Sequence, residues 1–167
     1  MIRVGIGYDV HRVAEDRDLV LGCVRIGDAG VGLEGHSDAD VVAHAVCDAL
    51  LGAAALGDIG EHFPDTDERY RGYPGKDFLA RVAAMVRGAG YAVINIDCVV
   101  MCDVVKLGER KKAMAAAIAG ALGVDAACVC VKATTFEGRG AVGRGEVIAC
   151  EAVACIDTTA QGGALTP

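Results

Sequence analysis

The sequence has no tryptophan and few aromatic side chains, since phenylalanine, tyrosine and tryptophan together make up 4% of its 167 residues. Its hydrophobic residues, 53% of the total, are therefore mostly aliphatic. A chain of this length can bury a sizeable aliphatic core within one domain. We predict that residues 1–167 form a single domain and that the small, polar stretch 157–167 is a flexible tail.

Excess positive charge and long apolar segments are also absent. The formal net charge is −7, and an acidic surface does not suit nucleic acid, whose phosphates require clustered Lys and Arg. No apolar run approaches the length of a membrane span, and the N-terminal residues lack the apolar core of a signal peptide. The eight cysteines include no pair of C-x-x-C motifs. We therefore predict free thiols, a cytoplasmic location and no nucleic-acid or membrane partner.

Hydrophobic periodicity predicts strands that alternate with helices. Strands are expected at residues 3–11, 19–26, 91–103, 128–134 and 147–156. The first helix is expected to be capped by Ser37 or Asp38 and to run to about Ala55. Two more helices are expected before Gly88 and before Gly123, and residues 27–35 and 57–75 read as loops. This order predicts an α+β sandwich, with helices packed on one face of a mixed β-sheet.

Three of the four histidines lie in two short segments that also carry carboxylates. Asp9 and His11 are two residues apart on a predicted strand, so their side chains share a face. His44 follows on a predicted helix, where the three side chains could meet. One carboxylate and two imidazoles with an open fourth position form a ligand set for catalytic zinc. The same pattern also suits histidines that make ordinary hydrogen bonds, so both interpretations stand at this point.

Three further segments carry functional groups. Residues 57–67 form an Asp-rich loop that could bind sugar hydroxyls or a cation, or could be a solvated turn. Residues 132–137 close a strand with Lys132, hydroxyl groups and Glu137, which suit phosphate oxygens and Mg²⁺. Arg144 and Glu146 lie in a glycine-containing stretch that could be a site or a simple hairpin turn.

These segments, in this order, resemble the 2-C-methyl-D-erythritol 2,4-cyclodiphosphate synthases of the non-mevalonate isoprenoid pathway. The resemblance covers about residues 2–156. It rests on GYDVH at 7–11, HSDAD at 36–40, DALLGAAALGDIG at 48–60, FPDTD at 63–67, KATT at 132–135 and GRGE at 143–146. It implies a lyase that cyclises 4-diphosphocytidyl-2-C-methyl-D-erythritol 2-phosphate and releases CMP. It also implies a homotrimer with each site between neighbouring subunits.

The resemblance further implies a role for each matching residue. Zn²⁺ would be held by Asp9, His11 and His44, and Glu137 would bind Mg²⁺ or Mn²⁺ together with the substrate diphosphate. His36 and Thr135 match positions that stabilise the transition state. Substrate contacts are implied for Ser37, Asp48, Asp58, Ile59, Gly60, Phe63, Pro64, Asp65, Thr66, Asp67, Lys132, Thr134 and Arg144. Cytidine contacts are implied for Cys102, Asp103, Val104, Val105, Lys106, Leu107 and Gly108.

The sequence departs from the family pattern at two places. Residues 103–106 read DVVK and lack the proline that usually precedes the lysine, so we expect a less rigid cytidine loop. Ala141 replaces an aromatic residue that lines the family's central cavity, where isoprenoid diphosphates bind. This second change counts against isoprenoid binding more than against catalysis.

Two other functions fit the same residues. A zinc-dependent phosphohydrolase could use the same three ligands, but it would need a carboxylate as general base for a zinc-bound water. A trimeric binding module could hold a structural zinc. Inorganic phosphate or a ring-opened product would reveal the hydrolase, and ligand binding without CMP release would favour the binding module.

Overall fold

The computed structural model describes residues 1–27 and 29–158, and it contains a five-stranded sheet with the order β4–β1–β7–β5–β6. The strands are β1 (Ile2–Ala14), β4 (Gly32–Leu33), β5 (Tyr91–Met101), β6 (Val129–Thr134) and β7 (Val147–Thr158). The β5–β6 pair is parallel, and the other neighbouring pairs are antiparallel. The prediction of a mixed sheet is therefore confirmed.

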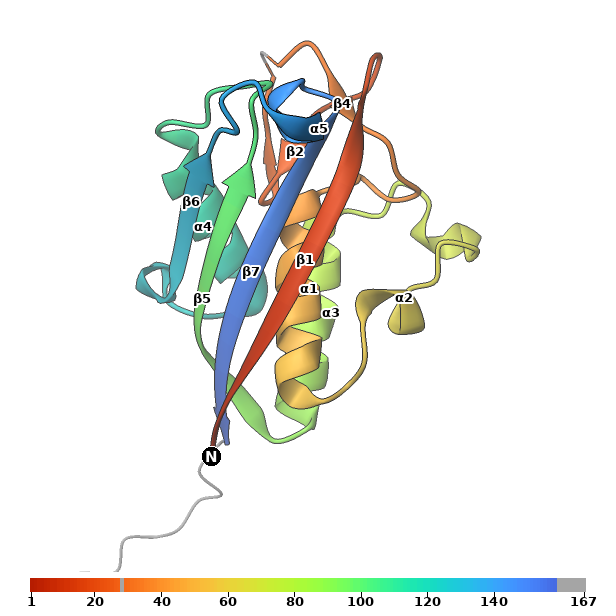
Figure 1. Ribbon diagram of the computed structural model, residues 1–167. Coiled ribbons are helices and arrows are strands. Elements are labelled where there is room, and N and C mark those ends of the chain that lie inside the picture. The colour runs from red at the N-terminus through yellow and green to blue at the C-terminus, as the bar shows by residue number, and fades with distance from the viewer. Residues whose placement is uncertain (28, 159–167) are drawn as a thin grey trace, which may run out of the picture.

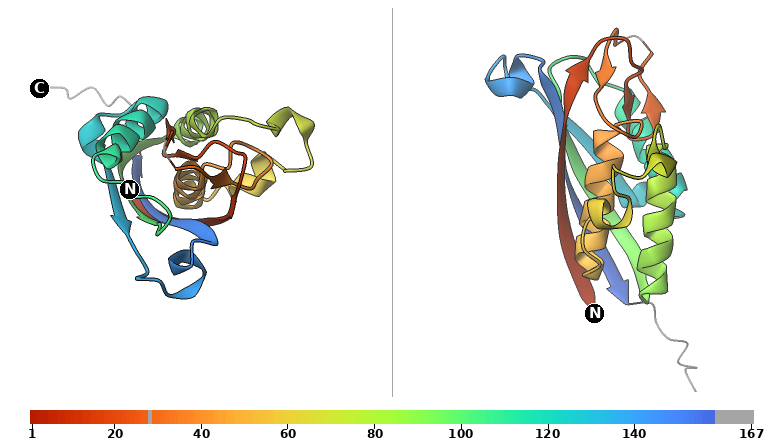
Figure 2. Two further views of the ribbon diagram at one scale, coloured as in Figure 1. Left: turned by 90° about the horizontal axis from the view of Figure 1, so that it is seen from above. Right: turned by 90° about the vertical axis from the view of Figure 1, so that its right-hand side faces the viewer.

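Three long helices, α1 (Val41–Ala54), α3 (Gly75–Gly88) and α4 (Arg110–Leu122), cover one face of this sheet (Figures 1 and 2). The core between the layers is aliphatic, with side chains such as Val46, Leu50, Ile148 and Ile156 fully buried. The short helix α5 (Gly140–Gly143) lies on the opposite side of the sheet (Figure 2). This arrangement confirms the predicted α+β sandwich with its main helices on one face.

Helix α1 lies directly on strand β1 because two inward positions of that strand are glycines. A Cβ on Gly5 would collide with the carbonyl oxygen of Ala49, and one on Gly7 would collide with that of Ala45. Side chains alternate across a strand, so Asp9 and His11 continue the same inward row toward α1. The two glycines therefore bring the α1 face that carries His44 close to these side chains.

Asp40, rather than Ser37 or Asp38, is the N-cap of α1. Its fully buried carboxylate accepts hydrogen bonds from the backbone N–H groups of Val42 and Ala43. It also accepts N–H groups of Gly22 and Cys23 in a distant turn, at 2.8 and 2.6 Å. These tertiary donors select Asp40 over the nearby candidates Ser37 and Asp38, and local sequence does not reveal them.

The remaining differences from prediction concern short elements. The strand expected at 19–26 is a hairpin of β2 (Val20–Leu21) and β3 (Val24–Arg25), because Gly22 and Cys23 both adopt a positive φ. The loop expected at 57–75 contains α2 (Ile59–His62) and a 3-10 turn, η1 (Glu68–Tyr70). A second 3-10 turn, η2 (Ala126–Cys128), precedes β6.

Strand β7 extends to Thr158, so residues 157 and 158 of the expected tail pair within the sheet. The rest of that tail lies outside the described residues. No helix in the described part of the chain is long and apolar enough to span a membrane.

Candidate metal centre and adjoining pockets

Asp9, His11 and His44 meet at one point between β1 and α1. The Oδ2 atom of Asp9 lies 3.0 Å from Nε2 of His11 and 3.0 Å from Nδ1 of His44. The two ring nitrogens are 3.2 Å apart. All three candidate ligand atoms lie within 4.8 Å of one another. Each of the three side chains thus offers one metal-ligand atom to a common centre.

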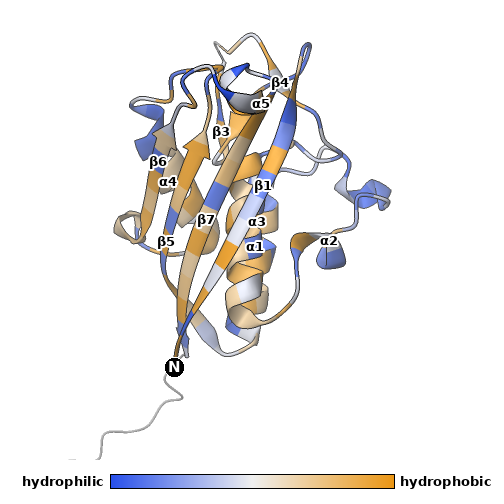
Figure 3. Cartoon of the chain, in the orientation of Figure 1, coloured by the Kyte–Doolittle hydropathy of each residue, from blue (hydrophilic) through white to orange (hydrophobic). Residues whose placement is uncertain are grey.

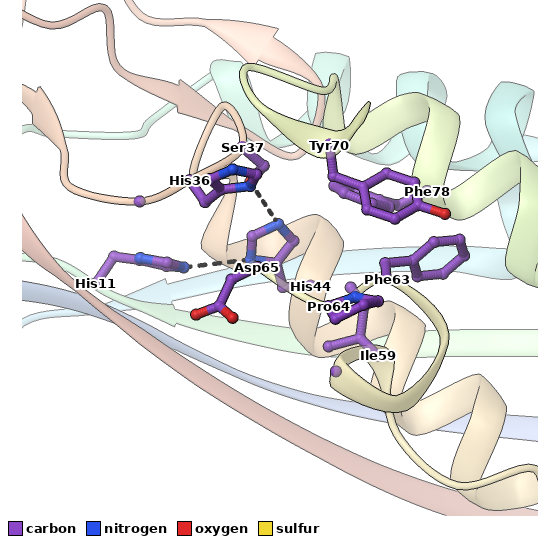
Figure 4. A pocket seen from close by; sticks show the side chains of 12 residues that line it. His11, His36, Ser37, His44, Ile59, Phe63, Pro64, Asp65, Tyr70 and Phe78 are labelled. Carbon is purple, nitrogen blue, oxygen red and sulfur yellow. Dashed lines mark hydrogen bonds between the residues drawn. The ribbon is translucent and has the colours of Figure 1, made fainter. Parts of the chain in front are cut away.

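The second nitrogen of each imidazole has its own partner. Nδ1 of His11 lies 2.6 Å from the carbonyl oxygen of Glu34, which can only accept, so this nitrogen carries a proton, and Nε2 is the nitrogen that faces Asp9. Nε2 of His44 lies 3.2 Å from Oγ of Ser37, so His44 stands between His11 and Ser37 (Figure 4). Such outer contacts orient metal-binding histidines, and their presence here fits a metal site.

The charges of the three groups are strongly linked. Burial acts to raise the pKa of Asp9, but hydrogen bonds and charge from His11 and His44 outweigh it and lower that pKa far below its usual range. Burial acts to lower the pKa of His11, but the hydrogen bond and charge of Asp9 outweigh it and raise that pKa above 6.5. Asp9 therefore holds a proton on His11 more tightly, at a position that a divalent cation would take, and the donor set fits zinc.

A cavity of about 450 Å³ opens beside the three donors (Figure 4). Its walls include His36 and Ser37 on one side and Ile59, Pro64 and Asp65 on the other. Nε2 of His36 is buried and has no hydrogen-bond partner in the described structure. An unpaired buried nitrogen is uncommon in proteins, so this atom is a candidate for contact with a ligand.

Aromatic side chains form a further wall that the sequence did not identify as part of the site. Tyr70 and Phe78 line the cavity beside the predicted Phe63. The ring centroids of Phe63 and Phe78 are 5.0 Å apart, and those of His44 and Phe78 are 5.7 Å apart in an edge arrangement. With Tyr73, four of the chain's seven aromatic rings gather here. Because the chain has so few aromatic residues, the grouping of four of them between positions 63 and 78 could have indicated this wall from the sequence.

Several carboxylates predicted to touch substrate accept hydrogen bonds from the loops around the cavity. Asp48 accepts the N–H of Ile59 at 2.7 Å, and Asp58 caps α2 through the N–H of Glu61 at 2.9 Å. Asp67 caps η1. These three residues and Thr66 do not line the cavity. Gly60 and Phe63 do line it.

A second hollow of about 710 Å³ lies at the carboxyl ends of β5 and β6. All seven residues predicted to contact cytidine, 102–108, line it, and so do Thr134 and Thr135. Lys111 and Ala133 complete it, although the sequence did not single them out. Glu137 is exposed in the turn after β6 and accepts a hydrogen bond from the hydroxyl of Thr135.

The structure does not bring the two groups of predicted site residues together within one chain. Strands β7 and β5 separate β1 from β6, a distance of three strand spacings or about 14 Å. The two cavities share no lining residue. Lys132 pairs with Asp97 at 2.7 Å, and Arg144 pairs with Glu146 at 2.7 Å, outside both hollows.

Comparison with known proteins gives one consistent result. The sequence model of the YgbB family matches residues 2–157. The 2-C-methyl-D-erythritol 2,4-cyclodiphosphate synthase of Desulfosudis oleivorans is 57% identical over 155 residues, which cover 93% of this chain and 92% of that protein.

Solved structures agree with the sequence matches. The bifunctional IspDF of Campylobacter jejuni matches with a TM-score of 0.91 and 42% identity, over 95% of this chain and 43% of the longer one. The IspF of Plasmodium falciparum, in a CDP complex, matches with a TM-score of 0.82 and 30% identity, over 95% of this chain and 97% of that one.

Proposed function

Because the chain belongs to the YgbB family of 2-C-methyl-D-erythritol 2,4-cyclodiphosphate synthases, which are lyases, we propose that it converts 4-diphosphocytidyl-2-C-methyl-D-erythritol 2-phosphate to the 2,4-cyclodiphosphate and CMP. The observation that carries the proposal is the Asp9, His11 and His44 donor set beside a cavity lined by His36, whose buried Nε2 has no hydrogen-bond partner among the described residues. These groups suit a reaction between two phosphates.

In this reaction an oxygen of the 2-phosphate attacks the β-phosphorus, and the bond from that phosphorus to the bridging oxygen breaks. CMP leaves with the bridging oxygen, and no water is consumed. Both reacting groups are anionic, so catalysis depends mainly on positioning and on neutralising their charge. A zinc ion held by Asp9, His11 and His44 would polarise a phosphate oxygen as a Lewis acid.

Other residues of the chain would bind the phosphates, limit water and hold the nucleotide. His36 and Ser37 line the cavity, and the His36 nitrogen and the Ser37 hydroxyl would hydrogen-bond phosphate oxygens there. Phe63, Tyr70 and Phe78 line the cavity with aromatic rings and would limit the access of water to it. In the second hollow, residues 102–108 would hold the cytidine.

The turn after β6 would contribute the second cation site. Glu137 is an exposed carboxylate next to the nucleotide hollow and to Thr135. Mg²⁺ commonly takes one or two carboxylates together with substrate phosphate oxygens, and this setting fits that ion or Mn²⁺. Thr135 would stand beside the same phosphates.

We also propose that the sites form between subunits of a homotrimer. The two hollows lie three strands apart, so one substrate needs hollows from two chains. On the uncovered face of β1, Ile2, Val4 and Ile6 are each at least 65% exposed and Tyr8 is 57% exposed. Figure 3 shows hydrophobic segments, in orange, at intervals along this strand. Such a continuous apolar row on a sheet face is typical of a protein interface. The number of subunits comes from the family resemblance.

Phosphorus NMR with the cytidyl substrate, Zn²⁺ and Mg²⁺ tests the proposal. We expect CMP and a cyclic diphosphate to appear together. CMP with a linear product, or inorganic phosphate, would indicate the alternative zinc-dependent phosphohydrolase. Bound substrate without CMP release would indicate a binding module. The cytoplasmic location stays a prediction from the sequence.

A further inference from the structure

Asp103 connects two loops that the proposed function uses for different purposes. It follows β5 at the start of the nucleotide loop, residues 103–108. One carboxylate oxygen accepts the backbone N–H of Phe136 at 2.7 Å, and the other lies 3.5 Å from the nitrogen of Gly138. Both amides belong to the turn after β6 that carries Glu137. The carboxylate thus spans from one loop to the other.

The turn around Glu137 needs such an acceptor. Glu137 has a φ of 51° and Gly138 a φ of 75°, so two consecutive residues adopt the left-handed conformation. This conformation is unfavourable for a glutamate by about 1–2 kcal/mol unless its surroundings stabilise it. A carboxylate that accepts the flanking N–H groups supplies a strong, charge-assisted contact of this kind.

We propose that Asp103 is a positioning residue that couples the nucleotide hollow to the Glu137 cation site. This inference rests on the proposed function. The resemblance assigned Asp103 to cytidine binding, but its carboxylate is occupied by backbone donors, and a free carboxylate would repel an anionic nucleotide. Through these contacts, ordering of the nucleotide loop favours the turn that presents Glu137, and the reverse also holds.

The test measures CMP and CDP binding with and without Mg²⁺ by titration calorimetry. Asp103→Ala should bind CMP roughly tenfold more weakly, the loss expected for one charge-assisted hydrogen bond. It should also lose most of the Mg²⁺ enhancement of CDP binding. Asp103→Asn, whose amide oxygen still accepts the Phe136 N–H, should recover part of both. The matched control is Asp125→Ala, which removes a similar exposed cap, bonded to the N–H of Ala127 at 2.8 Å, and should change neither.

A double-mutant cycle with Glu137→Gln separates coupling from general loosening. If Asp103 acts through Glu137, Asp103→Ala should remove no further Mg²⁺ dependence in the Glu137→Gln background, although CMP binding should still weaken. Additive losses of Mg²⁺ dependence would overturn the inference. So would an Asp103→Ala variant that binds both nucleotides as the wild type does.

Amide hydrogen exchange of the wild-type protein gives a measurement that needs no variant. The Phe136 N–H should be protected, and exchange at the rate of a free amide would overturn the inference. If the wild type bound neither CMP nor CDP, the proposed function would fail together with the inference. Normal wild-type binding with an unaffected Asp103→Ala variant would overturn the inference alone.

Discussion

Gly7 of β1 lies directly beneath the carbonyl oxygen of Ala45 of α1, with no space for a side chain between them. A Cβ on Gly7 would collide with that oxygen and lie 2.6 Å from the Ala49 nitrogen. Ala45 is next to His44, and Gly7 is two residues from Asp9. The close contact between strand and helix therefore sets the geometry of the candidate metal centre.

Gly7→Ala should both destabilise the protein and weaken metal binding. Overpacking of a core typically costs about 1–3 kcal/mol, and here the neighbours are backbone atoms that cannot rotate away. Moving α1 outward would separate His44 from Asp9 and His11. Urea unfolding and zinc titration would measure the two effects. The control is Gly120→Ala on α4, where no atom lies within 4 Å of the added Cβ. Removing glycine from that helix should stabilise it by about 0.5–1 kcal/mol.

His44→Ala should abolish stoichiometric zinc and CMP release while leaving a folded chain. His62→Ala is the matched control, because His62 bonds the carbonyl oxygen of Leu56 at 2.7 Å, away from the three donors. Metal content by mass spectrometry of the intact protein and circular dichroism would give the two readouts. Stoichiometric zinc in His44→Ala would contradict the ligand assignment.

Ser37→Ala should weaken zinc binding without abolishing it. It removes the partner of the second His44 nitrogen, 3.2 Å away, and leaves all three donors in place. Loss of such an outer contact typically weakens metal binding by about 10–100-fold. Competition with a chelator of known affinity would measure the change. Unaltered zinc affinity would show that Ser37 does not orient His44.

Zinc affinity should fall as the pH is lowered. In the metal-free protein Asp9 raises the pKa of His11 above 6.5, so a proton must leave before the imidazole can bind metal. By the same linkage, the His11–Asp9 pair stabilises the metal-free fold at pH values below the unfolded pKa of His11, and this contribution disappears as the pH rises through the folded pKa. Thermal unfolding with zinc and with a chelator, at pH values between about 6 and 8, should show zinc stabilising the fold more at the upper end. His11→Gln should remove this trend.

Glu137→Gln should raise the Mg²⁺ concentration needed for activity by about tenfold or more, because a neutral amide replaces the one charged protein ligand. Zinc content should not change, since Glu137 lies outside the three-donor centre. Initial rates across a Mg²⁺ titration, at fixed zinc, are the measurement. Overlapping titration curves for the variant and the wild type would exclude the proposed role.

Ile6→Asp should break the assembly and leave the subunit folded. Ile6 is 65% exposed in the single chain, so the new charge costs little there but would be buried between subunits. Sedimentation velocity should show monomers that lack activity. Ala116→Asp, on the exposed side of α4, adds the same charge and should preserve the assembly. An Ile6→Asp protein that kept the wild-type mass in solution would place the interface elsewhere.

Much of the fold followed from periodicity. Alternation along β1 placed Asp9 and His11 on one face, and hydrophobic periodicity predicted the helix that carries His44. The structure bears out both features. The N-cap at Asp40 did not follow, because its selection depends on the N–H groups of Gly22 and Cys23, which are distant in sequence.

The sequence by itself determined the chemical groups: the Asp9, His11 and His44 donors, the loop residues 102–108 and the family to which they belong. The tertiary structure alone decided which groups share a cavity. It placed Tyr70 and Phe78 beside the metal donors and separated the two hollows by three strand spacings. It also determined that the carboxylates of Asp48 and Asp103 accept hydrogen bonds from loop amides. Residue type and local spacing fix what a side chain can bind, whereas strand order and backbone partners far along the chain fix what it meets.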